Sequence, residues 1–338
     1  YAGLVYTAAS SRLQSAELEY IINDCGARAY ITSKYKADQA AEIVAATPGV
    51  ELRLMLDGTI EGYESYEAAV EAQSPEPLAE ERIAGLDMLY SSGTTGMPKG
   101  ISREFPNEPL EGFNNGVSML AGLLFGVDET KRYLSPAPFY HAAPLRFCMS
   151  MHMLGATIVA MENFDAETYL ELVDEHEITH SQVVPTMFVR MLKLDEATRS
   201  KYDVSSLECV IHAAAPCPIP TKKAIIEWFG PVVHEYYAGS EGNGFVYCNS
   251  EQWLAHKGTV GQAIIGTIHI VDDDDDGNEL PVGEEGTVYF EGGGTFEYHG
   301  DPDKTADSRL GNGWSTLGDV GRIDDDGFLY LTDRKAYM

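Results

Sequence analysis

The chain has 338 residues, of which 44% are hydrophobic and 22% charged. This composition excludes a disordered or collagen-like protein and leaves room for about two domains. The 53 acidic residues outnumber the 23 Lys and Arg, so the net charge of −30 argues against nucleic-acid or anionic-membrane partners and favours a highly soluble, salt-adapted surface. No apolar run reaches the roughly 20 residues that span a bilayer. The five cysteines lie far apart without a C-x-x-C pair, which predicts reduced thiols in the cytoplasm.

Up to about residue 257, predicted helices alternate with predicted strands. The first helix has Ser15 as its expected N-cap and ends at Gly26. The elements that follow are a strand over 29–32, a helix near 37–46, strands over 52–56, 87–90 and 155–161, a helix over 165–175, strands over 178–184 and 208–211, a helix over 220–229 and a strand over 232–237. This alternation predicts an α/β fold whose parallel sheet is covered on both faces and binds ligands at the carboxyl ends of its strands.

A different pattern begins after Gly258. Gly- and Asp-rich turns separate predicted strands over 264–271, 286–290 and 327–331, which is typical of an antiparallel, β-rich subdomain. We therefore expect an α/β part over residues 1–257 and a β-rich subdomain over 258–334. Tyr1 is not a natural start, and no closing element follows 333–335, so we expect the chain to be part of a longer protein.

The strongest local signal is the run YSSGTTGMPKG, from Tyr90 to Gly100. It follows a predicted strand and combines hydroxyls, glycines and one lysine in a single loop. Glycines let the backbone wrap around phosphates, hydroxyls bind phosphate oxygens or a Mg²⁺ shell, and lysine supplies a positive charge. The spacing is not that of a P-loop, and Pro98 prevents a helix directly behind the loop.

Three further segments stand at the right order and distance for one family. They are His212–Pro216 (HAAAP), Tyr236–Gly242 (YYAGSEG), and Trp314–Asp319 (WSTLGD) followed by Asp333-Arg334-Lys335. With the loop after Tyr90, they resemble the adenylate-forming superfamily of acyl- and aryl-CoA synthetases. Within it, the segments SPAPFYHAAPLRF, THSQVVPTMFVRML and EYYAGSEGNGF look most like bacterial fatty-acid–CoA ligases.

The resemblance covers essentially the whole chain and implies the layered, parallel-sheet large N-terminal domain of that superfamily with its β-rich subdomain. The family's small C-terminal domain would be absent, with the hinge starting at 335–338, where Ala336 stands in place of the common Asp or Lys. The implied enzyme is an AMP-forming acid–thiol ligase. It activates a fatty acid with ATP and Mg²⁺ to an acyl-adenylate, which coenzyme A then converts to acyl-CoA.

The resemblance also assigns roles to individual residues. Lys99, Ser240, Glu241 and His141 are the implied catalytic residues, with Glu241 also the Mg²⁺ ligand. The nucleotide and its phosphates would be bound by Ser91, Ser92, Gly93, Thr94, Thr95, Gly96, Lys99, Ala213, Ala214, Ala215, Glu235, Tyr236, Tyr237, Ser240, Asp319 and Arg334. The acid would be bound by His141, Val184, Ala238, Gly239 and Gly244.

Other interpretations stay open. The acid could instead be an aryl, steroid-side-chain or other carboxylate, and the protein could be a nucleotide-binding module without catalysis. His176–His180 matches the zinc-protease pattern H-E-x-x-H, but we expect the helix to end near His176, which separates the two histidines. The run Asp272–Asp276 imitates a calcium loop without the Glu at its twelfth position. The sequence does not decide between a monomer and a homo-oligomer.

Overall fold

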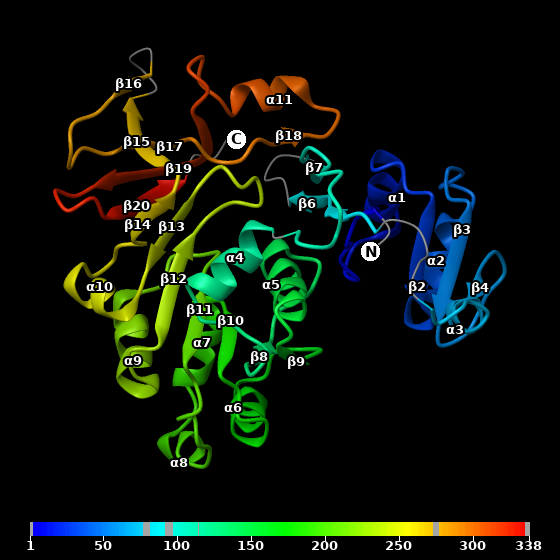
Figure 1. Cartoon of the computed structure of the whole chain (residues 1–338), viewed down its shortest axis with the longest axis horizontal. Coiled ribbons are helices and arrows are strands. Elements are labelled where there is room, and N and C mark those ends of the chain that lie inside the picture. The colour runs from blue at the N-terminus through cyan, green and yellow to red at the C-terminus, as the bar shows by residue number, and fades with distance from the viewer. Residues whose placement is uncertain (1–2, 77–81, 92–96, 114, 273–276, 335–338) are drawn as a thin grey trace. The chain divides into compact units, whose positions relative to one another are not determined.

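A computed structural model describes residues 3–76, 82–91, 97–113, 115–272 and 277–334 (Figure 1). The chain forms two compact units. Unit 1 comprises residues 1–113 and 298–300, and unit 2 comprises residues 114–297 and 301–338.

Unit 1 contains three small sheets. A parallel sheet is formed by β2 (Ala29–Ser33), β3 (Leu52–Leu56) and β4 (Glu64–Ser65), a parallel pair by β1 (Val5–Tyr6) and β5 (Leu86–Asp87), and a third sheet by β6 (Leu89–Ser91), β7 (Lys99–Ser102) and β18 (Glu297–Tyr298). The helical segments are α1 (Ser15–Asp24), η1 (Lys34–Lys36), α2 (Ala37–Ile43) and α3 (Tyr66–Glu71). Apolar residues of α1 and α2 form a small core with Val50.

The start of α1 corrects one prediction. The backbone N–H of Gln14 donates to Glu17 Oε2 at 2.8 Å, so Gln14 is the N-cap and Ser15 is the first helical residue. The Ser15 hydroxyl instead bonds Glu42 of α2. The expected N-cap Ser15 was wrong because an acidic residue in the first turn can satisfy the N–H of the residue that precedes the helix.

Unit 2 is built on a seven-stranded sheet in the order β14-β13-β12-β11-β10-β8-β9. Its strands are β8 (Arg132–Ser135), β9 (Thr157–Ala160), β10 (His180–Val183), β11 (Cys209–His212), β12 (Val233–Tyr237), β13 (Phe245–Cys248) and β14 (Gln262–Ile265). The strands β9, β8, β10, β11 and β12 pair in parallel. At the edge of the sheet, β13 pairs antiparallel with β12, and β14 pairs antiparallel with β13. All four residues of β10 and of β11 are buried, as expected for central parallel strands covered on both faces.

The two faces of this sheet carry separate cores. The helices of unit 2 are α4 (Gly116–Leu123), α5 (Ala142–Met153), α6 (Ala166–Glu175), α7 (Pro185–Leu192), α8 (Glu196–Arg199), α9 (Ile219–Phe229), α10 (Ser250–Ala255) and α11 (Pro302–Asp307). One core joins the strands to α6, α7, α9 and α10, and the other joins them to α4 and α5. Neighbouring strand residues such as Cys209 and Val210 enter opposite cores, because side chains alternate along a strand.

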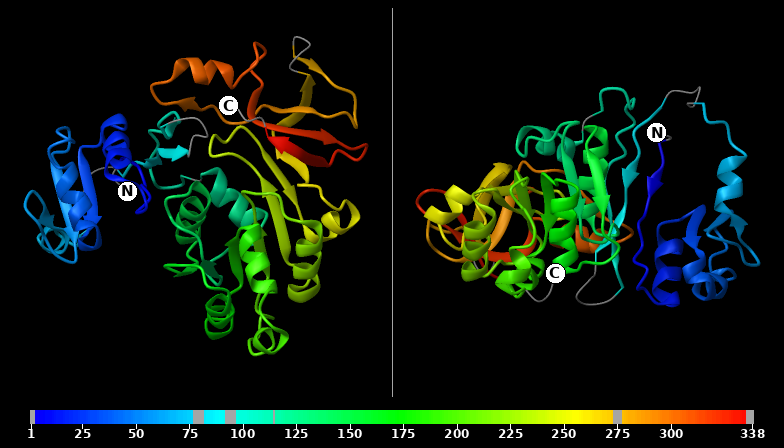
Figure 2. Two further views of the ribbon diagram at one scale, coloured as in Figure 1. Left: turned by 180° about the vertical axis from the view of Figure 1, so that it is seen from behind. Right: turned by 90° about the horizontal axis from the view of Figure 1, so that it is seen from below.

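A second sheet completes unit 2. It is antiparallel, has the order β16-β15-β17-β19-β20, and is formed by β15 (Thr267–Asp272), β16 (Asn278–Glu279), β17 (Gly286–Glu291), β19 (Ser315–Ile323) and β20 (Leu329–Arg334). It lies at one end of the seven-stranded sheet, where Figure 2 shows it in yellow to red. The predicted fold class, parallel-sheet layers with a β-rich part, is confirmed. The boundary that we expected at residue 257 stays a prediction.

The predicted strand over 264–271 was wrong, since two strands share it. β14 belongs to the seven-stranded sheet and β15 to the five-stranded sheet. Gly266 separates them with φ +78°, and a Cβ there would lie 2.9 Å from Glu291 O. The apolar residues before and after Gly266 do not reveal such a break, because each stretch suits the core of either sheet.

The H-E-x-x-H segment is divided between two elements, as predicted. α6 ends at Glu175 with His176 as its C-cap, Glu177 has φ +45°, and His180 lies on β10 with Nε2 2.8 Å from Phe125 O. Among the described residues, no group of three or more His, Cys, Asp or Glu could hold a metal ion. No described helix is long and apolar enough to cross a membrane. Residues 273–276 of the acidic run lie outside the described residues.

Candidate active site

The carboxyl ends of β11 and β12 form the centre of the candidate site in unit 2. The two strands are in register, with His212 opposite Glu235, and the segment Ala213–Ala215 follows β11 directly. Ala214 and Ala215 are exposed, and Ala214 has φ +73°. Their side chains end at Cβ, so the backbone here is open to a flat ring.

Tyr237 and Asp319 join the two sheets of unit 2 at this edge. The Tyr237 hydroxyl, at the end of β12, donates to Asp319 Oδ2 on β19 at 2.7 Å. Burial raises the pKa of Tyr237, so the hydroxyl is a neutral donor at physiological pH. The guanidinium of Arg334 on β20 lies 3.6 Å from the second carboxylate oxygen, Asp319 Oδ1. Asp319 is therefore oriented by two neighbours that its sequence motif does not contain.

A tight turn after β12 carries Ser240 and Glu241. The N–H of Gly242 donates to Gly239 O at 3.2 Å, which closes the turn. A Cβ on Gly239 would lie 2.6 Å from Glu241 Oε2 and 2.5 Å from Leu317 Cδ2, so a larger residue would displace one of these side chains. The turn thus brings the Glu241 carboxylate, which is half-buried, next to the strand that carries Asp319.

Arg146 also reaches this turn, although no sequence motif assigned it a role. Its Nη1 donates to Ser240 O at 3.2 Å from α5. The signal that could have indicated it is its position, a single arginine in the otherwise uncharged stretch from Ala142 to Met151. The guanidinium holds the Ser240 carbonyl and places a positive charge beside the turn.

The residues predicted to bind the acid lie at the starts of α5 and α7 and in the segment after β12. His141 is exposed at the N-cap of α5, with its ring 4.3 Å from that of Tyr140. Partial burial lowers the pKa of His141, which keeps the imidazole neutral at pH 7. Val184 is the N-cap of α7, and Ala238 is half-buried just after β12. Gly244 is buried, and a Cβ there would lie 2.1 Å from Phe290 Cδ1, so packing against this ring explains its glycine.

Two predicted nucleotide-binding residues have buried side chains. Glu235 forms an ion pair with Lys222 of α9. Tyr236 accepts a hydrogen bond of 2.8 Å from Gln182 Nε2, and its ring stacks 4.9 Å from that of Phe245. The structure does not bring these two side chains to the exposed edge.

The predicted phosphate loop belongs to unit 1. Ser91 on β6 pairs in antiparallel register with Lys99 on β7, and Ser91 Oγ lies 3.5 Å from Lys99 O. The segment after Pro98 is a strand, so the prediction that no helix follows the loop is confirmed. Ser92, Gly93, Thr94, Thr95 and Gly96 lie outside the described residues.

Comparison with known proteins identifies the family. The model of the AMP-binding enzymes matches residues 1–298. The chain belongs to the AMP-binding enzyme family. Similar relatives include a 2-succinylbenzoate–CoA ligase of Bacillus velezensis, 26% identical over 95% of this chain and 66% of that protein. Another is the long-chain-fatty-acid–CoA ligase FadD13 of Mycobacterium tuberculosis, 29% identical over 99% of this chain and 64% of that protein.

Solved structures of this family share the fold. The amide bond synthetase McbA from Marinactinospora thermotolerans is 25% identical, with a TM-score of 0.79 over 100% of this chain and 66% of that one. The inhibitor-bound N-terminal domain of FACL13 from Mycobacterium tuberculosis is 26% identical, with a TM-score of 0.77 over 98% of this chain and 80% of that one. The chain therefore spans slightly less than two thirds of both curated relatives.

Proposed function

We propose that this AMP-binding chain carries the adenylation site of an acid–CoA ligase, and that its acid is a fatty acid. The carboxylate of the acid attacks the α-phosphorus of ATP, a new C–O–P linkage forms, and pyrophosphate leaves. The thiol of coenzyme A then displaces AMP to give the thioester. The chain has little covalent chemistry to perform, so its task is to orient reactants and to balance developing charge.

The observation that carries the proposal is the edge at which β11, β12 and β19 meet. Exposed small residues at Ala214 and Ala215 suit an adenine ring, and Asp319, oriented by Tyr237 at 2.7 Å, suits the ribose hydroxyls. The Ser240–Glu241 turn follows the same strand end, where the hydroxyl would donate to the α-phosphate. Unit 2 by itself therefore offers groups for the adenine ring, the ribose and the α-phosphate of an adenosine phosphate.

The same edge fits a magnesium ion. Glu241 offers carboxylate oxygens, the ligand type that Mg²⁺ prefers, and Mg²⁺ usually takes few protein ligands because phosphates and waters supply the rest. The edge carries Glu241 and Asp319, which would repel an unmetallated triphosphate. Bound there, Mg²⁺ would neutralise phosphate charge. Arg146, through the Ser240 carbonyl, holds the turn that carries Glu241.

The choice of a fatty acid rests on sequence motifs and on one of the relatives. The motif segments look most like fatty-acid–CoA ligases, and FadD13 is a relative, whereas the 2-succinylbenzoate–CoA ligases favour an aryl acid. His141 at the start of α5 and the small residues Ala238 and Gly239 would border the acid. We keep the fatty acid as the proposal and the aryl acid as its alternative.

A pyrophosphate-exchange assay tests both the adenylation chemistry and the identity of the acid. The chain is incubated with Mg·ATP, labelled pyrophosphate and single acids, namely fatty acids of graded length, benzoate derivatives and a steroid-side-chain acid. Mass spectrometry of acyl-AMP accompanies it. Exchange driven by fatty acids supports the proposal, and exchange driven by aryl acids alone replaces the substrate while keeping the chemistry. Binding of AMP without exchange for any acid would identify a non-catalytic nucleotide-binding module.

A further inference from the structure

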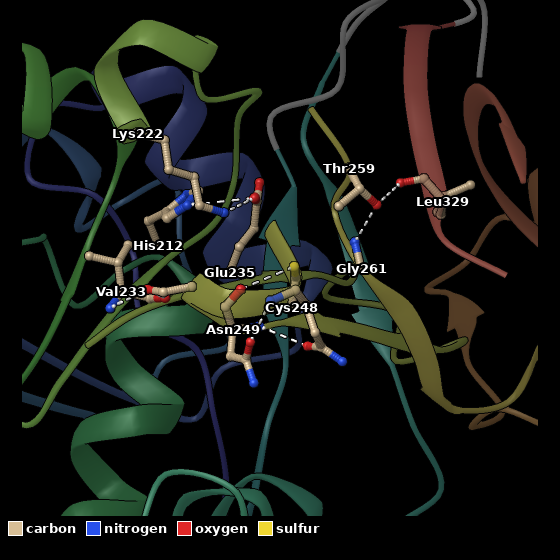
Figure 3. Close-up of polar contacts among 11 residues, drawn as sticks. His212, Lys222, Val233, Glu235, Cys248, Asn249, Thr259, Gly261 and Leu329 are labelled. Atoms are coloured by element: carbon tan, nitrogen blue, oxygen red, sulfur yellow. Dashed lines mark hydrogen bonds and ion pairs between the residues drawn. The ribbon is translucent and has the colours of Figure 1, made fainter. Parts of the chain in front are cut away.

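Three polar side chains are buried together on the face of the sheet that α9 covers (Figure 3). Glu235 is 5% exposed, and Lys222 and His212 are 0% exposed. The Lys222 ammonium forms an ion pair with Glu235 Oε2, and His212 Nε2 lies 3.6 Å from the same oxygen. Two charges removed from water carry a large desolvation cost that their attraction only partly offsets. Such a pair calls for an explanation beyond stability.

The surroundings show that the charges balance within the pair. The indole of Trp253 lies 5.0 Å from the Lys222 ammonium, and the ring of Phe188 meets His212 edge-on at 5.4 Å. Burial lowers the pKa of His212, so its ring is neutral at physiological pH. Glu235 therefore serves as counterion to Lys222, while the neutral ring of His212 packs beside it.

The two neighbours of Glu235 flank one segment of chain. His212 is the last residue of β11, and Lys222 lies in the first turn of α9, where its N–H donates to Pro218 O at 3.0 Å. Between them runs segment 213–218, which contains the exposed Ala214 and Ala215. The Glu235 carboxylate on β12 thus pairs with the residue beyond one end of this segment and packs against the residue at the other end.

This segment needs such support. Ala214 has φ +73°, a left-handed conformation that is unfavourable for a residue with a Cβ and persists only where the surroundings enforce it. The exposed side chains of Ala214 and Ala215 are too short to reach distant partners. Their conformation is therefore set by the residues on either side: Ala213 and Cys217 pack in the cores on the two faces of the sheet, and the buried residues at the ends of the segment complete this support.

We propose that Glu235 and Lys222 are positioning residues that order segment 213–218 for nucleotide binding. The proposal rests on the proposed function for the identity of the ligand, but the ordering itself does not. If the segment occupied its binding conformation only a tenth of the time, the apparent affinity for AMP would fall about tenfold.

The test compares variants of the whole chain. Lys222→Met/Glu235→Met removes both charges and keeps similar side-chain lengths, a change that folded proteins tolerate better than loss of one partner. Glu235→Asp keeps the charge but withdraws the carboxylate, and Lys222→Arg keeps both charge and reach. The matched control is Lys223→Met/Glu227→Met, an exposed pair 3.5 Å apart on the same helix.

Hydrogen exchange of peptides covering 209–218 without nucleotide reports the ordering, and calorimetry with AMP reports the affinity. We expect the double variant to melt near the wild-type temperature, to exchange faster in this segment, and to bind AMP about tenfold more weakly. Glu235→Asp should show a smaller change of the same kind. Lys222→Arg and the control pair should match the wild type.

The outcomes are distinct. Wild-type exchange and affinity in the folded double variant would overturn the proposal and leave the pair a purely structural one. If the double variant does not fold, the same readouts on Glu235→Asp decide. If the wild-type chain binds no AMP, the proposed function fails, and the role of the pair in nucleotide binding fails with it. The rate of hydrogen exchange in the double variant then still decides whether the pair orders the segment.

Discussion

His234 should make unit 2 sensitive to acid. It lies on β12, beside Glu235, with Nδ1 2.7 Å from the Tyr247 hydroxyl and its ring edge-on to Phe125 at 5.9 Å. Burial lowers the pKa of His234 to about 4, and electrostatic interactions with His180 and Lys222 add to this shift. In an unfolded chain a histidine has a pKa of about 6.5.

These two pKa values set the sign and the size of the change in unfolding free energy with pH. Because the folded-state pKa is the lower one, the unfolded chain binds more protons between pH 6.5 and pH 4, and stability falls as the pH falls through this window. From pH 7.5 to pH 5, His234 should remove about 2 kcal/mol of unfolding free energy, and at pH 4 about 3 kcal/mol. Buried His180 and His212, whose pKa values burial also lowers, should add to the loss.

The assay is urea unfolding followed by tryptophan fluorescence at pH 7.5 and pH 5. All three tryptophans (Trp228, Trp253 and Trp314) belong to unit 2, so the signal reports on the unit that contains His234. His234→Gln can still hydrogen-bond Tyr247 and does not titrate. The control is His152→Gln, since His152 is exposed.

We expect His234→Gln to lose about 2 kcal/mol less than the wild type between the two pH values. The His152→Gln control should lose as much as the wild type. Equal losses in all three proteins would refute the reasoning, because they would mean that the folded state accepts a proton on His234 without cost.

Further predictions concern the site and the surface. Glu241→Gln keeps the shape of the side chain but not its charge, and should lower pyrophosphate exchange at least about a hundredfold; near-normal exchange would contradict the role of Glu241. Tyr237→Phe deletes the hydrogen bond to Asp319 and should weaken AMP binding by about 1 kcal/mol in calorimetry; unchanged affinity would separate that bond from nucleotide binding. Gly244→Ala forces a Cβ against Phe290 and should cost about 1–3 kcal/mol in urea unfolding; an unchanged free energy of unfolding would contradict this account of the glycine. With a net charge of −30, the melting temperature should rise with KCl as repulsion is screened; a flat dependence would argue against a salt-adapted surface.

Local patterns were read correctly where neighbouring residues decide the structure. The strand over 52–56 was predicted with the observed bounds, and α6 ends before His176 as expected. β-branched residues after His176 and the proline that follows oppose a helix by themselves. The N-cap at Gln14 and the break at Gly266 were missed, because each depends on which partner accepts or blocks one backbone group.

Long-range contacts were beyond reach of the sequence. Tyr237 and Asp319 are 82 positions apart, and Arg146 and Ser240 are 94 apart. Glu235 and Tyr236 stand side by side in a motif, yet their side chains enter opposite sides of the sheet. A motif gives residue types and order, whereas the direction of each side chain follows from strand alternation and from what packs against each face.

By itself, the sequence determined the α/β fold class, the phosphate-loop and strand-end motifs, and through them the family. These properties depend on local periodicity and on residue types at short spacing, which the chain carries before it folds. Only the tertiary structure decided which carboxylates face the open edge, that Lys222 neutralises Glu235 inside the core, and that this buried pair lies beside segment 213–218. Each of these depends on burial and on distances between remote residues, which arise when the sheet and its helices pack together.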